Sequence, residues 1–144
     1  MIWAIIPAAG SGSRSGSDIP KQYRPLLGKP MLEYSLDVLA QHPDIDGIIL
    51  ALAADDSRWQ HIRQWRNTPL RTCIGGMRRS DSVLAAIEAL NDVTHNDTWL
   101  LVHDAARPCL RAEDPNRVIE SACVHPVGGL LAGAMEDTGK RGAA

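Results

Sequence analysis

The sequence predicts an α/β fold with a Rossmann-like, open and mostly parallel sheet that carries helices on both faces. Apolar runs recur along the chain and predict strands at residues 2–6, 47–53, 71–74, 98–102 and 129–132. Amphipathic segments lie between some of them and predict helices at about 30–40, 82–90 and 114–123. Apolar strands that alternate with amphipathic helices are typical of a parallel sheet buried on both faces.

The first predicted helix follows from the spacing of its leucines. Leu32, Leu36 and Leu39 recur at the period of an α-helix and therefore share one face. Pro30 suits the first turn, where its missing N–H removes no intrahelical hydrogen bond.

The other two predicted helices combine an apolar face with start signals. The shared face of the second helix consists of Val83, Ile87 and Leu90. Either Ser80 or Asp81 can supply its N-terminal cap. In the third helix Asp114 can act as the cap, and Pro115 suits the first turn.

Charge and cysteine content exclude several classes of protein. The 144 residues fit one domain, and a net charge of −2 gives no global positive field for nucleic acid or an anionic membrane. Three cysteines without a CxxC pair argue against a disulfide framework or a structural zinc site, and favour a reducing, cytoplasmic setting. No apolar run approaches the length of a membrane span, so we expect a soluble protein.

The last twelve residues have a different character from the rest. Residues 133–144 are mostly small and polar, and they offer nothing that would pair with a sheet or cover it. A doubly wound sheet rarely ends in this way. We therefore expect the fold to be incomplete at its C-terminal end, with the chain as the N-terminal part of a longer domain.

The loop after the first strand has the composition of a phosphate site. Gly10 and Gly12 let backbone N–H groups approach a ligand closely, and successive free amides suit phosphate oxygens. Arg14 and Lys21 would add positive charge for a triphosphate. The alternative is a plain turn with solvated cations. The glycine spacing, GxGxxxG, matches neither the dinucleotide fingerprint nor a Walker A loop.

Two further loops follow later strands, at the edge where open α/β sheets bind ligands. The stretch from Gly75 to Ser82 joins two glycines to a helix start, which suits a nucleobase or phosphate; a tight turn before a capped helix is the alternative. Asp104 has the carboxylate oxygens that Mg²⁺ prefers, but it could equally cap a turn or pair with Arg107. We interpret His103 as structural, and no residue set is arranged for covalent catalysis.

Four motifs taken together resemble one enzyme family. PAAGSGSR, PKQY, GGMRRSDSV and VHDAARP, in this order and spacing, are similar to those of the 2-C-methyl-D-erythritol 4-phosphate cytidylyltransferases of non-mevalonate isoprenoid biosynthesis. The resemblance covers the chain to about Arg141. It implies a fold like that of nucleotide-diphospho-sugar transferases. It also implies Mg²⁺-dependent transfer of CMP from CTP to methylerythritol phosphate, giving 4-diphosphocytidyl-2-C-methyl-D-erythritol and pyrophosphate.

The resemblance also implies roles for individual residues. Arg14 and Lys21 match the catalytic residues that stabilise the transition state, and Asp104 matches the magnesium ligand. The other matched positions bind substrate: Ala8, Ala9, Gly76 and Ser82 for cytosine, Gly10 and Gly12 for the triphosphate, and Ala105 and Arg107 around the ribose.

Members of the family are longer than this chain, and the resemblance implies what the further part supplies. Residues 134–144 look like the start of a dimerisation arm, and Thr138 matches a position that contacts methylerythritol phosphate across a homodimer. Met77 and Ala134 depart from the family pattern, which usually has a polar residue and a proline there. Two alternatives stay open: a cytidylyltransferase for ribitol 5-phosphate, and a nucleotide-binding chain without turnover.

Overall fold

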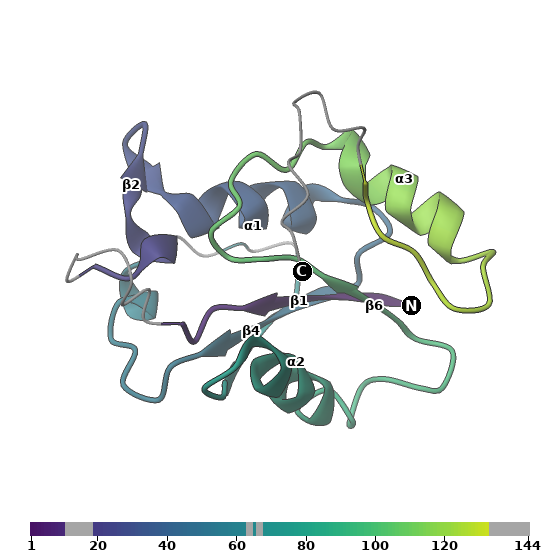
Figure 1. The fold of residues 1–144 in the computed structure, drawn as a ribbon, viewed down its shortest axis with the longest axis horizontal. Coiled ribbons are helices and arrows are strands. Elements are labelled where there is room, and N and C mark those ends of the chain that lie inside the picture. The colour runs from purple at the N-terminus through teal and green to yellow at the C-terminus, as the bar shows by residue number, and fades with distance from the viewer. Residues whose placement is uncertain (11–18, 63–64, 66–67, 133–144) are drawn as a thin grey trace, which may run out of the picture. The chain divides into compact units, whose positions relative to one another are not determined.

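A four-stranded parallel sheet forms the centre of the first of two compact units. The computed structural model describes residues 1–10, 19–62, 65 and 68–132, and the units are Met1–Ala112 and Glu113–Ala144. The sheet has the order β5-β4-β1-β6, with every neighbouring pair parallel (Figure 1). Its strands are β1 (Ile2–Pro7), β4 (Gly47–Leu52), β5 (Leu70–Ile74) and β6 (Trp99–Val102). The predicted parallel α/β sheet is confirmed.

Helices α1 (Met31–Gln41) and α2 (Arg79–Glu88) cover opposite faces of this sheet (Figure 1). The core beneath α2 consists of Trp3, Ile5, Ile49, Ala51, Ala86 and Leu90. Successive strand residues point to opposite faces, so the intervening residues of β1 and β4 face α1 and its three fully buried leucines. Burial on both faces explains why β4 reads GIILAL without a polar residue.

The start of β4 requires a glycine because an aromatic ring lies against it. Gly47 is the register partner of Trp3 in the neighbouring strand β1. A Cβ atom at position 47 would lie 2.5 Å from the Trp3 ring, closer than side-chain atoms approach one another in proteins. The indole of Trp3 therefore lies across the backbone of β4 and closes the core at the amino ends of the strands.

The connection between β1 and α1 contains a hairpin that the sequence analysis did not predict. A 3₁₀-helix, η2 (Lys21–Tyr23), leads into β2 (Pro25–Leu26), which pairs antiparallel with β3 (Lys29–Pro30). Leu27 and Gly28 form its two-residue turn and have φ values of +48° and +89°. Positive φ at both central residues is the geometry of a type I′ turn.

The second unit contains helix α3 (Glu113–Ala122), which confirms the third predicted helix to within a residue at each end. The predicted strand at residues 129–132 is wrong, because the structure assigns no strand there. Leu130 is 95% exposed, so this apolar run has neither a hydrogen-bonded neighbour in a sheet nor a core to enter. No helix among the described residues is both long and apolar enough to cross a membrane.

The N-terminal end of α2 also differs from the prediction. The helix begins at Arg79, three residues before the predicted start, and Arg78 occupies the cap position in place of Ser80 or Asp81. Asp81 lies in the first turn, where its carboxylate accepts a hydrogen bond from the backbone N–H of Arg78 at 3.2 Å. An aspartate in the first turn can satisfy a free N–H as well as a cap residue does.

Leu27→Asn is expected to stabilise the protein. Leu27 is 93% exposed, so its replacement loses little burial, whereas a left-handed conformation costs a leucine on the order of 1 kcal/mol more than asparagine. We expect the free energy of unfolding, measured by urea denaturation, to rise by about 0.5–1 kcal/mol. A lower value would show that the Leu27 side chain makes a favourable contact.

Candidate active site

The carboxyl ends of all four parallel strands meet at one edge of the sheet. Three backbone hydrogen bonds continue the strand ladders into the loops beyond this edge: Ala8 N donates to Ala51 O at 2.8 Å, Gly75 N to Leu52 O at 2.8 Å, and His103 N to Ile5 O at 3.0 Å. The loops that follow β1, β5 and β6, which were predicted to bind ligand, therefore begin with residues whose backbone is held by the sheet. This is the edge at which open α/β sheets bind ligands.

Gly75 brings the loops after β1 and β5 together. A Cβ atom at this position would lie 2.7 Å from Ala9 Cβ, 2.8 Å from Ser82 Oγ and 3.2 Å from Ala51 Cβ. Residues from β4, from the loop after β1 and from α2 therefore meet over a single glycine. The structure thus places Ala9 and Ser82, both predicted cytosine-binding residues, on either side of Gly75.

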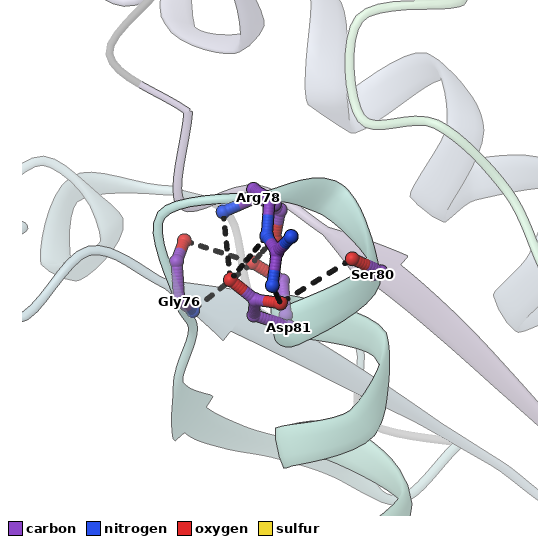
Figure 2. Close-up of polar contacts among 5 residues, drawn as sticks. Gly76, Arg78, Ser80 and Asp81 are labelled. Carbon is purple, nitrogen blue, oxygen red and sulfur yellow. Dashed lines mark hydrogen bonds and ion pairs between the residues drawn. The ribbon is translucent and has the colours of Figure 1, made fainter.

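The loop between β5 and α2 is held by its own polar groups. Ser82 is buried, and its Oγ accepts a hydrogen bond from Gly76 N at 3.2 Å and lies 3.3 Å from Gly76 O. Figure 2 shows the Asp81 carboxylate pointing toward Arg78, whose guanidinium holds the pKa of Asp81 below its usual range. The buried Ser82 hydroxyl therefore fixes the backbone of the loop at Gly76. Met77, also in this loop, is fully exposed.

Asp104 lies between two guanidinium groups. Its Oδ1 accepts from Arg79 Nε at 2.7 Å, and its Oδ2 pairs with Arg107 Nε at 2.9 Å. The pairing with Arg107 was one of the interpretations that the sequence left open. Arg79 was missed, although it lies in a selected loop, because its partner is 25 residues away along the chain. The next residue, Ala105, is buried at the base of this turn.

His103 holds the same turn through hydrogen bonds to α1 and to the backbone of Arg107. Its Nε2 lies 3.0 Å from Ser35 Oγ of α1 and 3.1 Å from Arg107 O, and Ser35 Oγ also donates to Arg107 O at 3.2 Å. Burial lowers the pKa of His103, so the neutral imidazole can donate to the carbonyl. These contacts agree with the interpretation of His103 as structural: it holds the backbone that carries Asp104.

Lys21 lies on η2, next to the end of β1. Its side chain is exposed, while the adjacent Gln22 is buried and donates from Nε2 to Ala8 O at 2.7 Å and to Gly10 O at 3.3 Å. A pocket of about 210 Å³ opens here, lined by Ala9, Gly10, Pro20, Gln22, Ala53, Asp55, Asp56, Ser57 and Arg58. The structure therefore places the η2 turn beside the predicted nucleotide loop.

Some of the predicted site residues lie outside the part of the chain that the structure describes. These are Gly12, Arg14 and Thr138, together with the predicted arm at 134–144. Their roles stay predictions. Among the described residues, no three His, Cys, Asp or Glu side chains are grouped as a metal site would need.

The sequence matches one known enzyme family along nearly its whole length. A model of the family described as 2-C-methyl-D-erythritol 4-phosphate cytidylyltransferase (IspD) matches residues 2–144. The chain belongs to this family. The family match agrees with the resemblance that the four motifs indicated, and it extends from β1 to the last residue.

Curated relatives carry the same name as the family. The chain is 46% identical over 143 residues to the 2-C-methyl-D-erythritol 4-phosphate cytidylyltransferase of Xylella fastidiosa (strain 9a5c), covering 99% of this chain and 62% of the relative. It is 49% identical over 142 residues to the enzyme of that name from Shewanella amazonensis, covering 99% and 59%. The chain thus spans about three fifths of the length of these relatives.

Solved structures of the family have the same fold. One crystal structure of a 4-diphosphocytidyl-2C-methyl-D-erythritol synthase matches with a TM-score of 0.81 and 30% identity, over 97% of this chain and 62% of that chain. The 2-C-methyl-D-erythritol 4-phosphate cytidylyltransferase of Francisella tularensis matches with a TM-score of 0.70 and 34% identity, over 87% and 53%. These matches confirm the predicted fold class.

Gly75→Ala is expected to destabilise the protein by about 1–3 kcal/mol, because the new methyl group would overlap Ala9 and Ser82 and force the loops apart. Urea denaturation would measure the change. Gly10→Ala is the matched control, since a Cβ atom there has no neighbour within 4 Å among the described residues. Equal losses in the two variants would contradict a specific packing role for Gly75.

Stability is expected to fall on mild acidification because of His103. Burial lowers the pKa of its imidazole, so the folded protein binds this proton less readily than the unfolded chain does. The contribution of His103 is therefore complete above the unfolded pKa of about 6.5 and is lost as the pH falls below it. Urea unfolding across this range would measure the loss. His103→Gln, which keeps an N–H donor, should flatten the slope, and an unchanged slope would contradict the assignment.

Proposed function

We propose that the protein is a cytidylyltransferase that transfers CMP from CTP to 2-C-methyl-D-erythritol 4-phosphate. The family membership and the names of the curated relatives support this proposal. The observation that carries it is the meeting of Ala9 and Ser82 over Gly75, with Gly10 and Asp104 at the same edge of the sheet. A base pocket and a polyphosphate site would then lie side by side.

The proposed chemistry is a single in-line displacement at phosphorus. A phosphate oxygen of the sugar phosphate forms a bond to the α-phosphorus of CTP, and the bond from that phosphorus to the bridging oxygen of pyrophosphate breaks. Negative charge builds up on the α-phosphoryl group during this step. Arg14 and Lys21 are proposed to stabilise that charge, because fixed cations act most strongly where charge develops. No covalent intermediate with the protein is required.

The loops would hold CTP mainly through backbone groups. At Gly76 a Cβ atom would lie 2.4 Å from Asp81 Cβ, so the turn admits no side chain and leaves the main chain to face a base. Ala8 and Gly10 continue β1, and Gly10 bears no side chain that would keep phosphates away. We propose that cytosine is read by this loop and that the triphosphate follows the segment after β1.

Asp104 fits the proposed role of magnesium ligand. Its carboxylate is partly exposed and supplies the oxygen donor that Mg²⁺ prefers, although both oxygens are paired with Arg79 and Arg107 in this structure. Bound at this position, Mg²⁺ would offset the negative charge of the nucleotide phosphates. If the carboxylate of Asp104 bound the metal, its ion pairs with Arg79 and Arg107 would break. The two guanidinium groups could then pair with phosphate oxygens.

Assembly and location are further parts of the proposal. We propose a homodimer in which residues from about 134 onward form an arm and Thr138 contacts the sugar phosphate of the partner's site. We also propose a cytoplasmic location, which is supported by the three free thiols of Cys73, Cys109 and Cys123. Neither nucleic acid nor a membrane is an expected partner, since the net charge is −2.

Calorimetric titration with CTP and with ATP, each with Mg²⁺ or with a chelator, tests the proposal. We expect CTP to bind in preference to ATP, and Mg²⁺ to strengthen CTP binding. Equal affinity for both nucleotides would contradict a cytidylyltransferase. Pyrophosphate release with methylerythritol phosphate and with ribitol 5-phosphate then separates the two sugar phosphates, and CTP binding without any release would indicate a chain that binds nucleotide without turnover.

Lys21→Ala is expected to lower the affinity for CTP about tenfold or more, since a charge-assisted hydrogen bond to phosphate is worth about 1.5–3 kcal/mol. Affinity for cytidine, which has no phosphate, should not change. Arg71→Ala serves as a control, because this cation lies near the amino end of β5, away from the carboxyl edge. An equal loss of CTP affinity in the control would show that total charge, and not the position of Lys21, controls binding.

A further inference from the structure

The 3₁₀-helix η2 is tied to the sheet by the two residues that follow Lys21. Gln22 is 6% exposed and Tyr23 is 7% exposed, whereas Lys21 itself is exposed. The backbone of η2 is closed by hydrogen bonds from Tyr23 N to Pro20 O at 2.9 Å and from Arg24 N to Lys21 O at 3.2 Å. Two buried polar side chains next to an exposed cation suggest anchors for that cation.

The first anchor is the amide of Gln22. Its Nε2 donates to Ala8 O at 2.7 Å and to Gly10 O at 3.3 Å, so one NH₂ group holds two carbonyls of the segment that follows β1. A primary amide has two N–H donors, and here both have an acceptor. η2 is thereby fixed to the end of the central strand.

The second anchor is the hydroxyl of Tyr23. It donates to Asp56 Oδ2 at 2.6 Å, and burial together with this carboxylate raises the pKa of Tyr23 far above its usual value, which keeps the donor proton in place. The other oxygen of Asp56 accepts from Arg58 N at 2.9 Å and Trp59 N at 3.1 Å. Asp56 is therefore itself fixed, at the turn after β4.

We propose that Gln22 and Tyr23 are positioning residues that hold Lys21 between the ends of β1 and β4, where its ammonium group meets the phosphates of the nucleotide. This inference rests on the proposed function. A lysine has a flexible stem that loses rotamer entropy when its ammonium group is fixed. Anchoring its backbone removes part of the remaining freedom before the ligand arrives, which strengthens phosphate binding.

Tyr23→Phe is the decisive variant, because it removes one oxygen atom and leaves the ring in the core. CTP affinity is expected to fall roughly 3- to 10-fold, the effect of one lost hydrogen bond, while cytidine affinity stays unchanged. Tyr34→Phe is the matched control: Tyr34 is the only other tyrosine of the chain, and its hydroxyl donates to Leu26 O at 2.7 Å in the hairpin. Equal losses of CTP affinity in the two variants would overturn the proposal.

A double-variant cycle shows whether Tyr23 acts through Lys21. In the Lys21→Ala background, Tyr23→Phe should cause no further loss of CTP affinity, because the group that it positions is gone. The same factor of loss in both backgrounds would overturn the proposal, as would a parallel fall in cytidine affinity. Gln22→Met, which keeps the chain length and removes the donors, should behave like Tyr23→Phe in this cycle.

Hydrogen exchange separates the failure of this inference from the failure of the proposed function. In the absence of nucleotide, Tyr23→Phe should speed exchange of the amides of Tyr23 and Arg24 and leave those of α2 unchanged. If the unaltered protein fails to bind CTP, the proposed function is wrong, while faster exchange in η2 would still support the anchoring. Unchanged exchange in η2 would overturn it.

Discussion

The pairing of β1 with neighbours on both sides is the constraint on which the other parts of the first unit depend. β1 pairs with β4 along one edge and with β6 along the other, and its residues are buried on both faces of the sheet. A strand in this position has no freedom to shift its register, because a slip of one residue would exchange its two apolar faces. Ala8, Ala9 and Gly10 follow directly from it. The loop that meets the proposed nucleotide therefore starts from a strand that is paired on both sides.

Polar groups at the carboxyl edge are held mostly by one another. Asp104 is paired with two arginines, Ser82 with the loop above it, and Asp56 with a tyrosine and two backbone amides. None of the buried side-chain nitrogen and oxygen atoms in the described ranges lacks a partner. Such internal hydrogen bonds prearrange the edge, so that a ligand meets groups whose positions are already fixed.

Elements that depend on local composition could be predicted, and elements that depend on distant partners could not. The strands of the parallel sheet could be predicted because burial on both faces requires apolar residues at almost every position, as in β4. The β2–β3 hairpin was missed because Leu27 adopts a left-handed conformation that usually indicates asparagine or glycine. At residues 129–132 the apolar composition was misleading, since an apolar run forms a strand only beside another strand. The contact of Arg79 with Asp104 and the contact of Tyr23 with Asp56 could not be predicted, because the partners are distant in sequence and only the fold brings them together.

The order of the sheet also bears on how the protein folds. In the register of β1 and β6, Ile2 pairs with Trp99, so this pairing joins segments from opposite ends of the first unit. Contacts between distant segments form slowly, because the entropy of closing the loop is lost before the contacts stabilise it. The turn at Asp104 depends on this pairing, because His103 N continues it by donating to Ile5 O. A nucleotide that needs both the segment after β1 and the turn at Asp104 would bind only the sheet in which β1 and β6 are paired, and it would raise the population of that sheet by mass action.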